Sequence, residues 1–171
     1  MAASARQPLV NRNGWLAFFL AALVVLLDQS VKAWLLGPFD LIDRAPVRIL
    51  PFFQLNSGWN PGVAFGIFHS HGDLGRWLLV GFAACVVVAL GLWVRRIDRV
   101  LSGAAIGLIM GGAIGNNIID RVRWGQVFDF LDFSGLHFPW VFNVADCGVS
   151  VGVGLILLES VIESLGAQSK V

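Results

Sequence analysis

Four apolar segments, each long enough to cross a lipid bilayer, dominate this sequence of 171 residues. They lie at about residues 15–36, 77–94, 100–119 and 144–165. As an α-helix at ~1.5 Å per residue, the first would reach about 33 Å, and the hydrocarbon core of a bilayer is ~30 Å thick. Hydrophobic residues make up 57% of the chain and charged residues 13%, against ~45–50% and about 25% in soluble domains. The sequence therefore predicts an integral membrane protein, mainly α-helical, with four transmembrane helices in a single domain over residues 1–171.

The remaining bulk properties narrow the class further. A net charge of +1 gives no electrostatic reason to expect nucleic acid as a partner. Cys85 and Cys147 fall within or beside apolar segments, so no disulfide framework is expected. The run Trp15–Leu27 resembles the front of a signal peptide, but no clear cleavage site follows it and apolar residues resume after Lys32. We therefore expect an uncleaved first helix.

The longest segment between spans, residues 37–76, has the pattern of a small β-sheet. Two short runs rich in β-branched and aromatic residues, VRILPFFQL at 47–55 and GVAFGIF at 62–68, are separated by turn residues. We expect this sheet to lie on the membrane surface between helices one and two. His69 and His71 follow, with Asp73. Two histidines in a polar turn are more typical of a solvated loop than of a metal site, so no metal ion is predicted.

The third apolar segment carries small residues at a regular spacing along one helical face, namely Gly103, Gly107, Gly111 and Gly115. Such a stripe lets a neighbouring helix approach closely. The fourth segment has its own pair, Gly148 and Gly152. We therefore expect helices three and four to pack tightly against each other.

The charged residues between the spans indicate an orientation. Four spans put both termini on one side of the membrane, and lysine and arginine divide evenly between the two sides. The connector RRIDR at 95–99 nevertheless packs three arginines into five residues, and short basic loops favour the cytoplasm. This density favours cytoplasmic termini, with residues 37–76 and 120–143 on the periplasmic side.

Residues 115–152 hold four of the nine aspartates of the chain, Asp120, Asp129, Asp132 and Asp146. Carboxylates beside hydrocarbon are costly and are usually functional. Asp129 lies in the aromatic run VFDFLDF, and Asp146 lies at the start of the fourth helix, where the helix N-terminus favours negative charge. Gly135 and Pro139 between them allow a chain reversal. We therefore predict that Asp129 and Asp146 meet at the membrane surface.

Two carboxyl groups that share a site cannot both ionise easily, so one holds a proton at neutral pH. Such a pair can hydrolyse an amide, because the ionised member takes a proton from water while the protonated member polarises the scissile carbonyl. The pattern does not say which aspartate plays which role.

Other interpretations of the same residues stay open at the level of the sequence. Two aspartates in a membrane loop are often helix caps or surface charges, and Asn143 has the position of an N-cap. Asp120 and Arg121 fit a salt-bridged helix end. Asp28 and Lys32, four residues apart, share a helix face, either as a snorkelling pair or as support for a polar site in the bundle. Intramembrane carboxylates also fit a small proton- or ion-coupled transporter.

Four motifs taken together resemble the lipoprotein signal peptidases, also called signal peptidase II. DQSVK at 28–32 resembles the Asp-Gln…Lys element of the first helix in that family, and NPGVAFGIF at 60–68 resembles its Asn-x-Gly-x-Ala-Phe box. NIIDR at 117–121, followed by GQVFDF, resembles the box that ends in the first catalytic aspartate, and FNVAD at 142–146 resembles the box that holds the second. The four motifs, in this order with four spans, cover nearly the whole chain.

The resemblance implies a membrane aspartyl endopeptidase with Asp129 and Asp146 as its catalytic pair. It also implies that five residues shape the site or bind substrate, Asn60, Gly62, Asp120, Arg121 and Asn143, and that Asp28 and Lys32 support them. The implied substrate is a bacterial prolipoprotein carrying diacylglycerol on a cysteine, and cleavage falls just before that cysteine. The implied location is the inner membrane, with the active site at its periplasmic face. The implied partners are thus lipidated signal peptides and membrane lipid, and no metal or organic cofactor is needed.

The third-helix box departs from the family pattern. Its usual form is Gly-Asn-x-x-Asp-Arg, whereas this chain has GNNIIDR, one residue longer. Counting back from Asp120 selects Asn117, and counting forward from Gly115 selects Asn116. These side chains point about 100° apart on an α-helix, and we predict that Asn117 faces the site because spacing to the aspartate sets the helix face. A π-bulge could instead absorb the additional residue.

Overall fold

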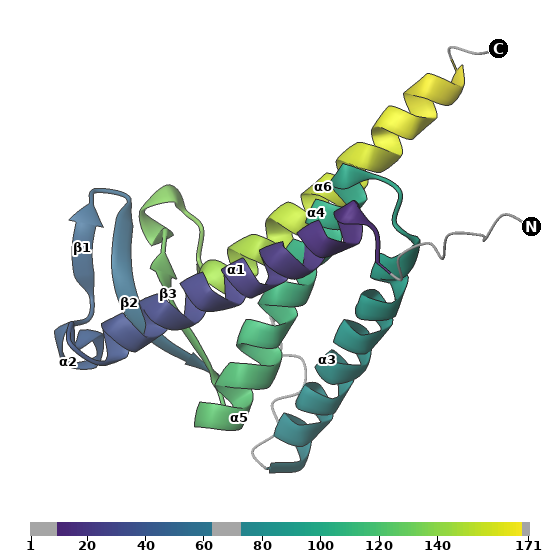
Figure 1. The fold of residues 1–171 in the computed structure, drawn as a ribbon. Helices are drawn as coiled ribbons and strands as arrows, with labels where there is room; N and C mark the ends of the chain where they lie inside the picture. The colour runs from purple at the N-terminus through teal and green to yellow at the C-terminus, as the bar shows by residue number, and fades with distance from the viewer. Residues whose placement is uncertain (1–9, 63–72, 169–171) are drawn as a thin grey trace, which may run out of the picture.

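Four long helical stretches and a small antiparallel sheet make up the protein, with the sheet at one end and both chain ends at the other (Figure 1). The structure, a computed structural model, describes residues 10–62 and 73–168. Stretches long and apolar enough to cross a membrane run over Arg12–Leu36, Asp73–Arg96, Val100–Trp124 and Val144–Gly166. The predicted four-span architecture is confirmed, although the second span begins before residue 77 and the third continues beyond residue 119.

Local sequence signals explain where these helices begin and end. Helix α1 (Arg12–Leu36) is capped by Asn11, whose Oδ1 accepts a hydrogen bond of 2.9 Å from the Gly14 amide. Helix α3 (Asp73–Trp93) passes through the short turn η2 (Val94–Arg96) to reach the third span. That span is continuous through α4 (Val100–Gly112), the π-helical turns of η3 (Ala113–Asp120) and α5 (Arg121–Trp124). It stops at Gly125, whose φ of 80° is a left-handed conformation that suits glycine.

Helix α4 lies between α1 and α6 (Val144–Gln168), whereas α3 lies at the side of the bundle (Figure 1). Close contact on one face of α4 requires glycine, because a Cβ at Gly107 would lie 2.4 Å from the Ala17 carbonyl oxygen of α1. On the facing side of α6, a Cβ at Gly152 would lie 2.7 Å from the Ala105 carbonyl oxygen of α4. Two glycine seams therefore hold three helices together.

The partner of the predicted glycine stripe on the third span differs from our expectation. Its members pack mainly against α1, since a Cβ added to them would meet atoms of Asn13, Ala17, Ala21 and Asp28, although Gly115 also faces the Ala145 Cβ of α6. Contact with α6 is made by Gly112, which lies one residue further around α4 and faces the Ala145 carbonyl oxygen. The expected tight packing of helices three and four exists, and it is made by Gly112 on α4 and by the predicted pair Gly148 and Gly152 on α6.

The sheet has the order β1-β2-β3-β4 with all neighbours antiparallel. Strands β1 (Val47–Leu50) and β2 (Phe53–Asn60) follow α1 and the short helix α2 (Leu41–Arg44). A small sheet in this segment was predicted, but residues 56–60, which we interpreted as turn residues, extend β2. The sheet is larger than expected, because β3 (Val127–Asp132) and β4 (Val141–Phe142), joined through η4 (Ser134–Leu136), come from the segment between the third and fourth spans. The second predicted run lies outside the described residues from Val63 onward, as do His69 and His71.

Strand β3 joins the sheet to the helices through alternating side chains. Phe128 and Phe130 are buried with Leu35 and Leu41 at the end of α1. Successive side chains of a strand point to opposite faces, so Asp129 between the two phenylalanines points away from this apolar cluster. The sheet therefore anchors Asp129 at the end of the bundle where α6 begins.

Candidate active site

The N-terminus of α6 is the centre of the site. Asn143 caps the helix, because its Oδ1 accepts a hydrogen bond of 3.0 Å from the Asp146 amide, and Asp146 Oδ2 accepts one of 3.0 Å from the Asn143 amide. This reciprocal arrangement is a capping box. Asp28 Oδ1, from α1, accepts a further hydrogen bond of 3.1 Å from the Ala145 amide. Two carboxyl groups thus satisfy amides that the first helical turn leaves unpaired.

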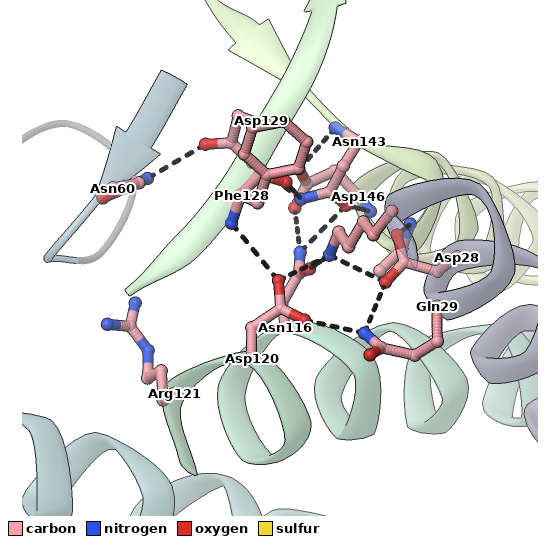
Figure 2. Close-up of polar contacts among 12 residues, drawn as sticks. Asp28, Gln29, Asn60, Asn116, Asp120, Arg121, Phe128, Asp129, Asn143 and Asp146 are labelled. Atoms are coloured by element: carbon pink, nitrogen blue, oxygen red, sulfur yellow. Dashed lines mark hydrogen bonds and ion pairs between the residues drawn. The ribbon is translucent and has the colours of Figure 1, made fainter. Parts of the chain in front are cut away.

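Asn143 also connects the two predicted catalytic residues. Its Nδ2 donates to Asp129 Oδ1 at 2.6 Å, while its backbone amide donates to Asp146 (Figure 2). The chain between the two aspartates reverses through η4 and β4, as Gly135 and Pro139 suggested. The structure therefore brings Asp129 and Asp146 to one asparagine, with Asp129 on the sheet and Asp146 on the helix.

The environment of Asp129 favours its protonated form. Asp129 is only 8% exposed to solvent. Burial raises the pKa of the Asp129 carboxyl, and the negative charge of Asp146 raises it further, to about 7. Hydrogen bonds from Asn143 and Asn60 and the positive charge of Lys32 act in the opposite direction but do not offset these effects. One member of the pair therefore holds a proton over much of the neutral range.

Lys32 organises the polar groups beneath the pair. Its three ammonium protons meet three oxygens, Asp28 Oδ2 at 2.7 Å, Asp120 Oδ2 at 2.6 Å and Asn116 Oδ1 at 2.8 Å. The side chains of Asp28, Lys32 and Asp120 are all 0% exposed. The interpretation of Asp28 and Lys32 as a snorkelling pair at a helix end is therefore wrong. The two residues instead support a buried polar site.

Gln29 belongs to the DQSVK motif but was not predicted as a site residue. Its Nε2 donates to Asp120 Oδ1 at 2.7 Å and to Asp28 Oδ2 at 3.1 Å (Figure 2). It therefore bridges two carboxyl groups that both contact Lys32. Its position directly after Asp28, on the face of α1 nearest the third span, was the only available signal.

The predicted orientation of the two asparagines in the third span was wrong. Asn116 faces the site, because its Nδ2 donates to Asp146 Oδ1 at 2.8 Å and to Asn143 Oδ1 at 3.2 Å. Asn117 instead accepts a long hydrogen bond of 3.4 Å from Arg121 Nε. The reason is η3, whose wider π-helical turn places the residue four before Asp120, rather than three before it, beside the pair.

Arg121 and Asn60 tie the end of β2 to the third span. The buried Arg121 guanidinium donates to the carbonyl oxygens of Pro61 and Gly62. Asn60 Oδ1 accepts a hydrogen bond of 3.1 Å from the Gly62 amide, and its Nδ2 reaches Asp129 Oδ2 at 3.5 Å. The simple salt bridge between Asp120 and Arg121 is not formed, since Asp120 is paired with Lys32.

Asp132, which matches no motif, has a different environment from the other aspartates of this segment. Burial raises the pKa of its carboxyl, but hydrogen bonds from Gln54, Ser134 and Asn56 outweigh burial and lower the pKa to about 2. Gln54 Nε2 lies 2.7 Å from Asp132 Oδ2. This side chain fastens β2 to β3, and its hydrogen bonds are with Gln54, Asn56 and Ser134 rather than with the pair.

The fold and the site together define a multi-pass membrane protein with two neighbouring carboxyl groups, one of them with its pKa raised to about 7, as in an aspartic peptidase. A family profile described as "Signal peptidase (SPase) II" matches residues 20–162. The chain belongs to the signal peptidase II family, and it is an aspartic peptidase of the membrane.

Individual relatives agree with this assignment. A lipoprotein signal peptidase of Caulobacter vibrioides is 51% identical over 154 residues, which cover 88% of this chain and 89% of that protein. One from a Methylobacterium species is 48% identical over 82% of this chain and 86% of its own. A solved structure described as a bacterial membrane enzyme superposes with a TM-score of 0.75 at 26% identity, over 86% of this chain and 88% of that one. None of these relatives supports the transporter alternative.

Proposed function

We propose that this signal peptidase II removes signal peptides from diacylglyceryl-modified bacterial prolipoproteins, and that Asp129 and Asp146 carry out the hydrolysis. The observation that most directly supports the proposal is that Asn143 holds both carboxyl groups at the start of α6. It donates a hydrogen bond of 2.6 Å to Asp129 and one of 3.0 Å to Asp146. The names of the relatives support the substrate class, and the aspartate geometry supports the chemistry.

In this mechanism Asp146 is the general base and Asp129 is the general acid. Both Asp146 oxygens accept hydrogen bonds, from the Asn116 side chain at 2.8 Å and the Asn143 amide at 3.0 Å, and neither donor can accept a proton in return. This surrounding suits a carboxylate. The pKa of Asp129 is raised to about 7. Among the residues that the structure describes, its Oδ2 has only a 3.5 Å contact with Asn60, so this oxygen can carry the proton.

The reaction then follows from these two protonation states. Asp146 takes a proton from a water molecule as the water attacks the scissile carbonyl carbon, and Asp129 donates its proton toward the carbonyl oxygen. As the C–N bond breaks, Asp146 gives its proton to the leaving amine and Asp129 takes back a proton from the tetrahedral diol, which completes cleavage before the lipidated cysteine. The other site residues act by positioning the pair. Hydrogen bonds and ion pairs that hold it in place come from Lys32, Asp28, Asp120 and Asn116.

The second group of site residues contributes on the substrate side. Asn60, Gly62 and Arg121 belong to one hydrogen-bonded unit next to Asp129. We assign to this unit the positioning of the substrate backbone near the pair. Asn117 contacts Arg121 and therefore acts on this unit only indirectly.

The proposed orientation places both termini in the cytoplasm and the aspartate pair at the periplasmic face of the inner membrane. Strand β3 and the start of α6, which carry the pair, lie at the end of the bundle opposite the termini (Figure 1). The basic connector at 95–99 lies at the end with the termini, which is the arrangement that short cytoplasmic loops favour. Residues 37–76 and 120–143 would then be periplasmic parts of a single peptidase domain.

Cleavage of a purified, lipidated prolipoprotein precursor tests the assignment of the pair. Asp129→Asn and Asp146→Asn should each lower turnover by roughly 10²–10⁴-fold, the usual contribution of general acid–base catalysis. Asp132→Asn is the matched control, because it makes the same change three residues further along β3, and should cleave normally once folded. Near-normal turnover of either pair variant, with circular dichroism matching the wild type, would show that its aspartate is not catalytic.

A further inference from the structure

Two adjoining hollows lie at the end of the bundle far from the aspartate pair. One, of about 500 Å³, is lined by Ala89, Leu92, Trp93, Arg95 and Arg96. The other, of about 330 Å³, shares Trp93 and Arg96 and is bounded on its far side by Arg99, Ser102, Glu159 and Glu163. Glu159 lies along α6 at roughly 20 Å from Asp146, at ~1.5 Å per residue, so neither hollow belongs to the active site.

The first hollow combines a positive charge with apolar surface. Arg95 and Arg96 are exposed and make no hydrogen bond or ion pair with another described residue. Trp93 is 56% exposed beside them, and Leu92 is 57% exposed. Tryptophan is enriched at the level of lipid headgroups, and guanidinium groups suit phosphate oxygens, which they can bind through two parallel hydrogen bonds.

The second hollow contains the carboxylate of Glu159, one oxygen of which lacks a hydrogen-bond donor among the described residues. Glu159 Oε2 accepts a hydrogen bond of 2.6 Å from Ser102 Oγ. Glu159 Oε1 is buried and has no hydrogen-bond partner in the described part of the chain, and the nearest cation, Arg99 Nη1, is 3.8 Å away. Arg99 is itself paired with Glu163. A buried acceptor without a donor is costly, so an ammonium group entering the hollow would supply what Glu159 lacks.

We propose that the two hollows together bind the headgroup of a membrane phospholipid that carries a phosphodiester and a primary ammonium group, as phosphatidylethanolamine does. The phosphodiester lies between Arg95 and Arg96, and the ammonium donates to Glu159. The first acyl carbons follow Leu92 and Ala89 along α3. Arg96, which lines both hollows, places the two halves of the headgroup next to each other.

The chemistry distinguishes this ligand from other membrane components. A phosphatidylglycerol headgroup offers the phosphate without an ammonium, and a phosphatidylcholine headgroup has a quaternary nitrogen with no N–H to donate. Inorganic phosphate has no acyl chain to cover Leu92. Only the primary amine satisfies all the groups that line the two hollows.

Lipid titration of the delipidated full-length protein in detergent, read by native mass spectrometry and by thermal stability, tests the proposal. Phosphatidylethanolamine should bind about tenfold more tightly than phosphatidylglycerol or phosphatidylcholine with the same acyl chains, the effect of one hydrogen bond to a charged group. Glu159→Gln should abolish that preference, and Arg96→Gln should weaken phosphatidylethanolamine and phosphatidylglycerol alike. Arg12→Gln removes the same charge at the same end of the bundle, outside the hollows, and should change nothing.

Equal affinity of the wild type for the three lipids would overturn the proposal, and this comparison requires no variant to fold. Retention of the phosphatidylethanolamine preference by Glu159→Gln would overturn it as well. Stabilisation by inorganic phosphate equal to that by the lipid would show that the occupant is a free anion. Precursor cleavage in detergent should be unchanged in all three variants, so the lipid site and the catalytic assignment stand or fall separately.

Discussion

Replacing Asn116 with alanine is the sharpest test of how the site is assembled. This asparagine contacts three polar groups, two at the start of α6 and one on α1: Asp146 Oδ1 at 2.8 Å, Asn143 Oδ1 at 3.2 Å and Lys32 Nζ at 2.8 Å. The residue is 6% exposed, so water cannot readily replace the lost amide. The variant Asn116→Ala therefore removes a donor from Asp146 and an acceptor from Lys32 at the same time.

The expected magnitude follows from these contacts. A hydrogen bond to a charged group contributes ~1.5–3 kcal/mol, so loss of two should lower the free energy of unfolding by roughly 3–6 kcal/mol. The contact with Asp146 is the one that bears on the reaction. If it orients the general base only in the transition state, its loss corresponds to a roughly 10- to 100-fold lower turnover, at ~1.36 kcal/mol per factor of ten.

Asn117→Ala is the matched control, because it truncates the same side chain at the neighbouring position. The contact it removes is the 3.4 Å hydrogen bond with Arg121 Nε, which is long and weak. Turnover of a lipidated precursor and the midpoint of thermal unfolding in detergent should both stay close to wild-type values for this variant.

Two results would refute the reasoning. If Asn116→Ala cleaved the precursor at a near-normal rate while Asn117→Ala did not, the third span would have α-helical rather than π-helical geometry next to the pair. If both variants were equally impaired, both side chains would reach the site, and the assignment of Asn116 as the single asparagine beside Asp146 would be wrong.

Three further predictions concern the protonation, the packing and the sheet. Burial and the charge of Asp146 raise the pKa of Asp129 to about 7, so the acid form of Asp129 is lost as the pH rises through that value. Turnover should therefore fall above about pH 7, and also at acidic pH, where Asp146 takes up a proton. A flat rate profile from about pH 5 to about pH 9 would contradict a shared proton. Gly107→Leu should lower the unfolding temperature and the activity because a Cβ there lies 2.4 Å from the Ala17 carbonyl oxygen, whereas Gly154→Leu, with nothing within 4 Å, should be neutral; equal unfolding temperatures would mean that α1 does not pack on this seam. Asp132→Asn should lower the free energy of unfolding by about 1–3 kcal/mol. Because the pKa of Asp132 is lowered to about 2, the stability that this carboxylate contributes is present above about pH 4 and is lost as the pH falls toward about 2. An unchanged unfolding temperature for the variant would contradict the role of Asp132 in joining β2 to β3.

Much of this architecture was predictable because a bilayer imposes strict local requirements. A chain that crosses hydrocarbon must satisfy its backbone within each span, so apolar stretches of sufficient length predict the four helices to within a few residues at their ends. The aspartates stood out for the same reason, since carboxyl groups beside hydrocarbon require a purpose. The cap at Asn143 was also predictable, because capping depends on residues only three apart.

Contacts between distant segments could not be predicted in this way. The periodicity of glycines in the third span shows that one face is small, but not whether α1 or α6 packs on it, because both helices are apolar and of similar length. The same limit applies to β3, whose alternation of Phe128, Asp129 and Phe130 fits a strand without naming its neighbour. Pairing with β2 across a separation of about 70 residues depends on how the helices place both ends.

The orientation of Asn116 belongs to the tertiary structure for a further reason. An α-helix, the default expectation for an apolar span, turns this side chain away from the face predicted for Asn117. The π-helical turns of η3 leave some α-helical hydrogen bonds unmade, and they are stable only because Lys32, Asn143 and Asp146 meet Asn116 from two other helices. The sequence by itself determined which groups gather at this membrane surface, and the packing of α1 and α6 around the third span decided which of them touch.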